Sequence, residues 1–294
     1  MSSRLAWTSF AMVVLASGAA CGGGSPAGPS SGATSSRAPI SLSVMTFNVH
    51  HGIDANGRYN LQHTIDAITR IQPDIVGLQE VTRNHPSYGC DDQPQRIASG
   101  LRAGTGQAWT LAYQQEWFTS DVSCQASGRG SGPETEGLVV LSKRSVSSPS
   151  FVTLPDSRLG LSVTVIDAYN LPIVVTHLTA GGGEAATRAQ QIDRLTSWAR
   201  GLGEPRVLMG DFNVGPQGPE LQPLFNSYHD VWTVATQLGR ASGAGDSKGG
   251  SRVDFIFFAP GSALTLESAQ VADTASSGVQ ASDHQPVVAT FTVR

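Results

Sequence analysis

Short apolar runs in this sequence end repeatedly in polar or ionisable residues. In an α/β sheet, strands that run in the same direction end at one edge, and ligand sites form there. The pattern therefore predicts one site built from carboxylate, amide and imidazole groups, which bind hard cations and transfer protons. The runs and the residues that follow them are Val44–Phe47 with Asn48, Ile75–Leu78 with Glu80, Ile173–Val175 with His177, and Val207–Met209 with Asp211 and Asn213.

Each of these residues has an ordinary structural explanation when it is taken alone. Glu80 fits a solvated charge at a strand end, and His177 fits a hydrogen-bonded core histidine. Residues 211–213 fit a turn, because Asp and Asn side chains hydrogen-bond to nearby backbone groups. Residues 282–284 fit a cap before a following strand. The functional interpretation depends on all the clusters occurring in one chain.

The elements that must position these groups are short strands interleaved with fewer helices. Apolar stripes at helical spacing predict helices over residues 61–71, before Pro73, and over residues 185–199, before Gly201. Runs rich in Val, Ile, Phe and Thr, bounded by Gly, Pro or Asp, predict strands. The predicted strands are Leu42–Val49, Ile75–Leu78, Gly137–Leu141, Leu161–Ala168, Ile173–Thr176, Val207–Met209, Val253–Phe258 and Val287–Val293.

The N-terminus has the pattern of an export signal. Arg4 precedes an apolar run at residues 5–15, small residues and then Cys21. Cys21 resembles the acylated cysteine of bacterial lipoproteins, although Gly18 replaces the usual aliphatic residue; an ordinary cleaved signal and a short anchor are the alternatives. We therefore expect a signal peptide over residues 1–21, a Gly/Ser/Pro linker over 22–39 and one catalytic domain over 40–294. The expected location is the cell envelope, as a lipoprotein, or the periplasm or medium.

Composition and the two remaining cysteines narrow the class of protein. In an exported chain, Cys90 and Cys124 are most simply a disulfide, with two free thiols as the alternative. The formal net charge of −4 argues against nucleic-acid binding through a broad basic field. It leaves a nuclease possible, because a metal ion can supply positive charge where the chemistry occurs.

Six ordered motifs resemble the series found in the endonuclease/exonuclease/phosphatase superfamily. That superfamily includes pancreatic-type deoxyribonucleases, abasic-site endonucleases, inositol polyphosphate phosphatases and neutral sphingomyelinases. Arg188 and Gln191, after His177, also fit the family pattern. The motifs are Met45–Val49, Leu78–Val81, Thr176–Leu178, Gly210–Asn213, Arg252–Phe257 and Ser282–Val287.

The resemblance implies a fold and a set of roles. The fold is an α/β four-layer α/β/β/α sandwich, with two packed, mainly antiparallel mixed β-sheets flanked by helices. Asp254 would orient His284, whose other nitrogen activates a water. Asp211 would position that water or assist the leaving group. The implied catalytic residues are His177, Asp211, Asn213, Asp254 and His284, and the implied ligands of Mg²⁺, or of Mn²⁺ or Ca²⁺, are Asn48, Glu80 and Asp283.

Three functions stay open at this stage. The leading one is hydrolysis of phosphodiesters in nucleic acid or phospholipid headgroups by a monomer, with membrane attachment through a lipid on Cys21 and no protein partner. A phosphomonoesterase acting on a sugar or inositol phosphate is the second, and a catalytically silent surface binding module is the third. Intervening loops choose the substrate in this superfamily. The aromatic residues of segment 83–133 either contact bases or a lipid surface or merely pack a disulfide-pinned loop. The segment 239–251, which contains Lys248, either lines the phosphate entrance or, as the sequence favours, is a plain flexible loop. Of His50 and His51, at most one is expected to face the site if the strand continues, because successive side chains alternate.

Overall fold

The computed structural model describes residues 38–294 of the 294-residue chain. The predicted signal segment, Cys21 and most of the linker lie outside the described residues. Within residues 38–294, the strands form a seven-stranded sheet in the order β10-β12-β13-β1-β2-β4-β3 and a six-stranded sheet in the order β5-β6-β7-β8-β11-β9. The strands are β1 Ile40–Asn48, β2 Ile75–Arg83, β3 Thr110–Phe118, β4 Thr135–Ser142, β5 Ser150–Thr153, β6 Leu159–Val165, β7 Leu171–His177, β8 Val207–Asp211, β9 His229–Asp230, β10 Ala241–Ser242, β11 Asp254–Phe258, β12 Leu264–Val271 and β13 Val287–Val293.

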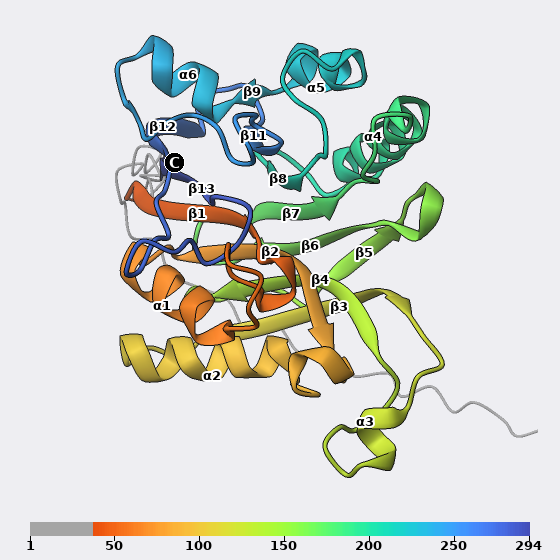
Figure 1. The fold of residues 1–294 in the computed structure, drawn as a ribbon. Coiled ribbons are helices and arrows are strands. Elements are labelled where there is room, and N and C mark those ends of the chain that lie inside the picture. The colour runs from red at the N-terminus through yellow and green to blue at the C-terminus, as the bar shows by residue number, and fades with distance from the viewer. Residues whose placement is uncertain (1–37) are drawn as a thin grey trace, which may run out of the picture. The chain divides into compact units, whose positions relative to one another are not determined.

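The two sheets pack face to face, and helices cover both outer faces (Figure 1). The central core holds inward residues of both sheets, such as Val44 and Val175. Their neighbours Met45 and Val174 point outward, because side chains alternate along a strand. The helices are α1 Leu61–Ile71, α2 Gln93–Thr105, α3 Ser123–Ala126, α4 Ala185–Arg200, α5 Gln222–Ser227 and α6 Val231–Gln237. Helices α1 and α2 cover the larger sheet, and α4 and α5 cover the smaller one. The predicted α/β/β/α sandwich is confirmed.

Strand direction brings the predicted site to one edge of the sandwich. β1 is parallel to β2, and β7 is parallel to β8. Asn48 at the end of β1 is hydrogen-bonded to Asp211 at the end of β8, so all four strands end on the same side. β11 runs antiparallel to β8 and pairs Asp254 with Asp211, while β13 runs antiparallel to β1. The starts of β11 and β13 therefore meet the ends of β1, β2, β7 and β8 (Figure 1).

A β-bulge in β2 places Glu80. The register with β4 shifts between Leu78 and Val81, and Glu80 has a φ of 57°. Leu78 and Val81 are three residues apart, yet both pack in the core under α1 and α2, which regular alternation would not allow. The extra residue directs the Glu80 side chain towards the edge where the other strands end. The sequence motif contains this residue but does not reveal the bulge.

Gly210 allows β7 and β8 to approach closely beside Asp211. Its φ is 155°, and a Cβ built at this position would lie 2.0 Å from the backbone oxygen of Thr176. Any larger residue would therefore push the two strands apart, because the obstacle is backbone and cannot rotate away. The glycine of the Gly210–Asn213 motif thus fixes the spacing between His177 and Asp211, which are paired in register.

The Cys90–Cys124 disulfide is present and joins the segment after β2 to α3. It closes a loop of 34 residues. Asn84 supports the same connection, donating to the carbonyl of Pro133 and accepting from the amide of Ser131. The bridge therefore ties the loop between β2 and α2 to the segment between β3 and β4.

Removing this bridge is expected to destabilise the protein without abolishing the fold. The Cys90→Ser/Cys124→Ser variant should lose roughly 3–4 kcal/mol of unfolding free energy, because the unfolded chain regains the freedom of the closed loop. Urea unfolding with and without a reductant measures this, and the reductant should affect the parent chain alone. Coincident unfolding curves for the two proteins would contradict the expectation.

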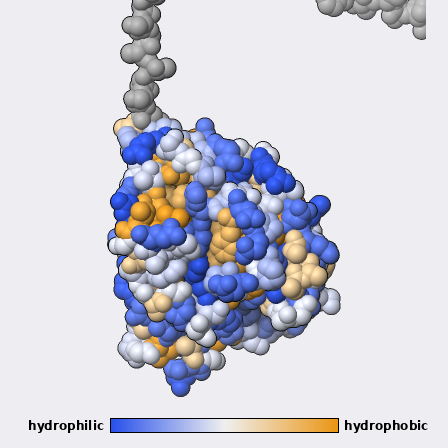
Figure 2. Space-filling view, turned by 90° about the horizontal axis from the view of Figure 1, so that it is seen from above, coloured by the Kyte–Doolittle hydropathy of each residue, from blue (hydrophilic) through white to orange (hydrophobic). Residues whose placement is uncertain are grey.

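The surface of the described unit is mixed in hydropathy. On the face shown in Figure 2, apolar patches are small and separated by hydrophilic residues. Among residues 38–294, the helices lack the combined length and apolarity needed to cross a membrane.

Candidate active site

Asn48 joins the two sheets at the centre of the site. From the end of β1, its Nδ2 donates to Glu80 Oε1 on β2 at 2.8 Å and to Asp211 Oδ2 on β8 at 3.0 Å. Its Oδ1 accepts from the backbone N–H of His50 at 3.0 Å. Asn48 is buried, so these three bonds satisfy its amide where water has little access. In this orientation Asn48 holds two carboxylates in place, and it would ligate a cation after its amide turned over.

His177 and His284 converge on the same carboxylate oxygen. The Nε2 atom of each lies 3.7 Å from Asp211 Oδ2, although the two residues are more than 100 positions apart. His177 ends β7, and His284 precedes β13 in the other sheet. Asp211 is buried, and burial together with the neighbouring Asp254 raises its pKa to about 7. A raised pKa of this kind is typical of groups that exchange protons near neutral pH.

Asp254 orients His284, as the sequence predicts. His284 Nδ1 lies 2.8 Å from Asp254 Oδ2, and since a carboxylate only accepts, Nδ1 carries the proton. Burial lowers the pKa of His284, but Asp254 outweighs it and the pKa rises to about 9. The pairing with Asp254 therefore stabilises the imidazolium that forms when Nε2 takes up a proton.

Arg158 determines the tautomer of His177. A guanidinium N–H of Arg158 lies 3.3 Å from His177 Nδ1, and because guanidinium only donates, Nδ1 must accept. The proton of neutral His177 is therefore on Nε2, which faces Glu80 Oε1 at 3.9 Å. Burial and Arg158 lower the pKa of His177 to about 3, so it stays neutral and donates from Nε2. Glu116, with a side chain that is 0% exposed, lies 3.5 Å from Arg158 and holds it there.

Both His50 and His51 face the site, which differs from the sequence-based expectation. His50 Nδ1 lies 3.5 Å from Asp283 Oδ1, and His51 Nε2 lies 3.2 Å from Glu80 Oε2. The strand does not continue past Asn48: residues 50–52 form a 3-10 turn with φ values of 46° and 55° at the two histidines. A turn sends both side chains to one side, whereas an extended strand would separate them. Burial raises the pKa of Glu80, but His177, His51 and the Asn48 hydrogen bond outweigh it, so the carboxylate is ionised at neutral pH.

Family comparison identifies the protein class. The model of the Endonuclease/Exonuclease/phosphatase family matches residues 45–284. This chain belongs to that family. Nucleases and phosphatases both hydrolyse phosphoesters, so the family makes this protein a phosphoester hydrolase by class. None of the curated proteins compared with it matches the sequence.

Solved structures of the family share the fold. An endonuclease/exonuclease/phosphatase from Beutenbergia cavernae is 24% identical, with a TM-score of 0.65, over 86% of this chain and 72% of that one. The human Nocturnin catalytic domain with bound sulfate is 20% identical, with a TM-score of 0.63, over 86% and 94%. A family member from Bacteroides vulgatus is 20% identical, with a TM-score of 0.60, over 87% and 100%.

The remaining predicted residues of this family member lie at the rim of the site. Asn213 uses one amide N–H on the carbonyl of Leu178, at 2.9 Å, and its backbone N–H donates to Asp211 Oδ1. Asp283 is half-exposed and lies 2.9 Å from Lys248 Nζ. Lys248 Nζ is also 2.7 Å from His284 Nε2. The sequence favours a plain flexible loop for the segment that contains Lys248, over a lining of the phosphate entrance, and the structure instead brings Lys248 into contact with two site residues.

The donor set fits a hard divalent cation, as is usual in this family. Ligand atoms of Asp211, Asp254 and His284 lie within 4.8 Å of one another, and the buried Asp254 Oδ1 has no hydrogen-bond partner within residues 38–294. Glu80 is ionised and partly exposed, and Asn48 links it to Asp211 by donating a hydrogen bond to each carboxylate. Carboxylate oxygens with room for retained water are what Mg²⁺ prefers. Since His284 Nδ1 is already bonded to Asp254, the carboxylates are the better ligands in this group.

A second acidic group lies behind His177 and was not predicted. Ligand atoms of Glu116, Glu136 and His177 lie within 4.8 Å of one another. Burial raises the pKa of Glu116 to about 8 and that of Glu136 to about 7. Arg158 already supplies the positive charge there and binds His177 Nδ1, so this group positions His177. Glu116 and Glu136 lie outside the six motifs and had no signal in the sequence.

Arg188 and Gln191 brace the segment after His177 and do not contact the site residues. Arg188 is buried, bonds to Glu220 and donates to the carbonyls of Thr179 and Gly181. Gln191 accepts from the backbone N–H of Thr179 at 3.0 Å and donates to its hydroxyl. Both family residues therefore fix the backbone that follows His177.

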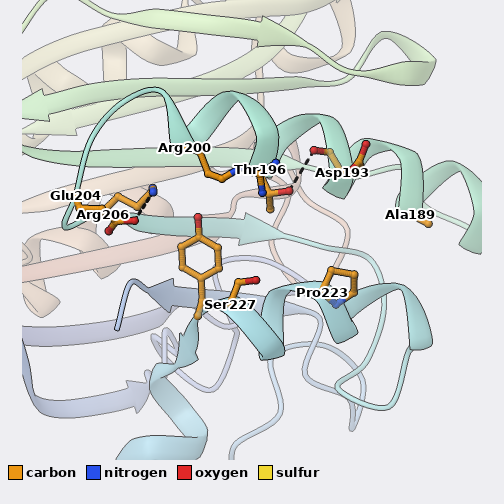
Figure 3. A pocket seen from close by; sticks show the side chains of 9 residues that line it. Ala189, Asp193, Thr196, Arg200, Glu204, Arg206, Pro223 and Ser227 are labelled. Carbon is orange, nitrogen blue, oxygen red and sulfur yellow. Dashed lines mark hydrogen bonds and ion pairs between the residues drawn. The ribbon is translucent and has the colours of Figure 1, made fainter. Parts of the chain in front are cut away.

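A cavity of about 280 Å³ lies apart from this site, against α4 and α5 (Figure 3). Its lining includes Thr196, Arg200 and Arg206 but none of the eight predicted site residues. Arg206 is already paired with Glu204 and donates to the carbonyl of Ala199. The cavity is therefore separate from the residues that carry the family chemistry.

Proposed function

We propose that this protein is a divalent-metal-dependent phosphodiesterase, with Mg²⁺ as its ion and Mn²⁺ or Ca²⁺ as alternatives. The observation that carries the proposal is the convergence of His177 and His284 on Asp211, beside the Asn48–Glu80 pair. His177 would donate a hydrogen bond to a phosphoryl oxygen, and His284 would accept a proton from the attacking water. Asp211 lies between the two imidazoles. Glu80 and Asp283, with Asn48, are the proposed ligands.

The residues of the chain divide the reaction between them. The bound cation would supply charge stabilisation at phosphorus and at the leaving oxygen. His284 would accept a proton from the attacking water at Nε2, while Asp254 stabilises the imidazolium that forms. His177, held in its Nε2–H form by Arg158, would donate to a phosphoryl oxygen, and the second amide N–H of Asn213 would do the same. Asp211, protonated in part near neutral pH, would position the water or assist the leaving oxygen.

The substrate is proposed to be a diester of nucleic acid or of a phospholipid headgroup. The bound sulfate in the Nocturnin catalytic domain supports a tetrahedral oxyanion as ligand of this fold. The loop between β2 and α2, which the Cys90–Cys124 bridge ties down, lies next to the site, because Tyr88 of this loop stacks on His51 with ring centroids 5.3 Å apart. Substrate choice is therefore proposed to depend on that loop.

Metal removal is expected to abolish turnover. The full chain should cleave plasmid DNA or sphingomyelin in the presence of Mg²⁺, lose that activity in EDTA and regain it when Mg²⁺ is restored in excess. A phosphomonoester assayed in parallel distinguishes the phosphomonoesterase. If no phosphoester shows chelator-sensitive turnover, the catalytically silent binding module is the better interpretation.

Export is proposed on separate grounds. It rests on the signal pattern of residues 1–21 and is supported by the Cys90–Cys124 bridge, since disulfides persist in oxidising compartments. Mass spectrometry of the mature protein would detect a lipid on Cys21, and an unprocessed N-terminus would contradict the proposal.

A further inference from the structure

Lys248 occupies the place where the attacking water must meet His284. Its Nζ lies 2.7 Å from His284 Nε2 and 2.9 Å from Asp283 Oδ2. An ammonium group only donates, so a contact this short requires His284 in its neutral form, with Nε2 as the acceptor. While the contact lasts, Nε2 cannot accept a proton from water. Turnover by the proposed function therefore requires Lys248 to leave His284.

The backbone under Lys248 is fixed, so the side chain alone has to move. Ser247 is buried; its hydroxyl accepts from the backbone N–H groups of Val253 and Asp254, both at 3.0 Å, and its carbonyl accepts from Gln285. Lys248 and Ser251 exchange two backbone hydrogen bonds of 2.9 Å across Gly249 and Gly250. This tight turn is thus tied to the strand that carries Asp254 and to the segment that carries His284.

The Lys248 side chain has room to turn. It is 41% exposed, and a Cβ at Gly249 or Gly250 would meet nothing within 4 Å. The lysine ammonium stands on a flexible four-carbon stem, so it can reach a different partner without movement of the backbone. Its present partner, Asp283, is 39% exposed, so solvent screens the ion pair and makes it weak.

We propose that Lys248 is a substrate-contacting residue that exchanges Asp283 for a phosphoryl oxygen of the bound substrate. This inference rests on the proposed function. An incoming phosphoryl group brings negative charge close to His284 and competes with Asp283 for the ammonium. The exchange frees His284 Nε2 for the water and leaves Asp283 free of its competing cation. Lys248 then neutralises charge at the phosphoryl group, where a preorganised cation is worth most.

The chain contains a matched control, because its other lysine, Lys143, lies outside the site. Lys143 donates to the carbonyl of Gln72 and lies over the ring of Trp109. Lys248→Met and Lys143→Met remove the same charge from the same side chain. Lys248→Arg keeps the charge and should retain part of the activity. Both lysines are only partly buried, so the substitutions should leave the fold intact, which equal melting temperatures would verify.

Three measurements on the full chain test the proposal. Lys248→Met should bind inorganic phosphate roughly tenfold more weakly by calorimetry in Mg²⁺, as expected for a lost charge-assisted hydrogen bond. It should bind Mg²⁺ alone roughly twofold to fivefold more tightly, because Asp283 has lost its competing cation. Its kcat/KM should fall roughly 10²-fold. Lys143→Met should match the parent chain in all three.

The opposite results would overturn it. If Lys248→Met binds phosphate as tightly as the parent chain, or hydrolyses substrate faster, then Lys248 does not contact the substrate and instead inhibits the enzyme by blocking His284 Nε2. If the parent chain itself hydrolyses no phosphoester, the proposed function fails, and phosphate and Mg²⁺ binding by the same proteins still decides the role of Lys248.

Discussion

Replacing His284 by Ala is expected to lower kcat/KM by roughly 10³-fold, the range of a lost general base. His284 Nε2 faces Asp211, and its Nδ1 is hydrogen-bonded to Asp254 at 2.8 Å, which stabilises the imidazolium formed when Nε2 takes a proton. The fold should persist, because removing a buried imidazole of this size leaves both sheets paired through backbone bonds. Hydrolysis of the best substrate found with Mg²⁺ measures the effect.

Asp254→Asn keeps the size of the side chain but changes the hydrogen bond that orients His284. An Asn amide can donate to Nδ1 and would favour the Nε2–H tautomer, which cannot accept a proton from water, so the loss should approach that of His284→Ala. His229→Ala, at an exposed histidine on β9, is the matched control and should retain full activity. Turnover in His284→Ala equal to that in the control would refute the assignment of His284 as general base.

Glu80→Gln is expected to lower kcat/KM by at least about 10³-fold, since several kcal/mol of charge stabilisation depend on the bound cation. The amide keeps the size of the side chain and removes the charge that a hard cation needs. Asn48 keeps its hydrogen bond to Asp211, and the substitution removes one of several neighbouring negative charges. The melting temperature should therefore change little. Calorimetry should also find Mg²⁺ binding weakened or lost.

Glu267→Gln provides the control for this loss of charge. Glu267 lies on β12, is 43% exposed and pairs with Arg240 away from the site. The control should bind Mg²⁺ and turn over substrate as the parent chain does. A Glu80→Gln protein with parental Mg²⁺ affinity would show that the cation is held by other carboxylates, of which Asp211 and Asp254 are the candidates.

Two elements that the sequence did not predict, helix α2 and strand β3, have a weak apolar pattern. Helix α2, Gln93–Thr105, contains two glycines and few large apolar residues, so its stripe is faint. Strand β3, Thr110–Phe118, carries Gln114, Gln115 and Glu116 in succession, which hides its alternation. These elements form because the neighbouring β2 and β4 supply paired backbone and a surface to cover. Tertiary contacts overrode a weak local signal.

The sequence by itself determined the fold class, through the resemblance of its six ordered motifs, and it predicted which polar groups stand at strand ends. Apolar runs that end in Asn48, His177 and Asp211 place these groups at strand ends, and strand direction then brings them together. Such local patterns are legible because buried strands are uniformly apolar and their polar ends stand out.

The tertiary structure alone decided which ring nitrogen of His177 and His284 carries the proton, and which residues beyond the motifs contact the site. The Nε2–H form of His177 depends on Arg158, which precedes β6, and on Glu116, which lies on β3. The two residues share no sequence motif. The turn that brings both His50 and His51 to the site depends on positive φ values that residue types do not reveal. The contact of Lys248 with His284 depends on the packing of Ser247 against β11. These are properties of distance and orientation between segments, and a hydrogen bond exists only once the fold has set both.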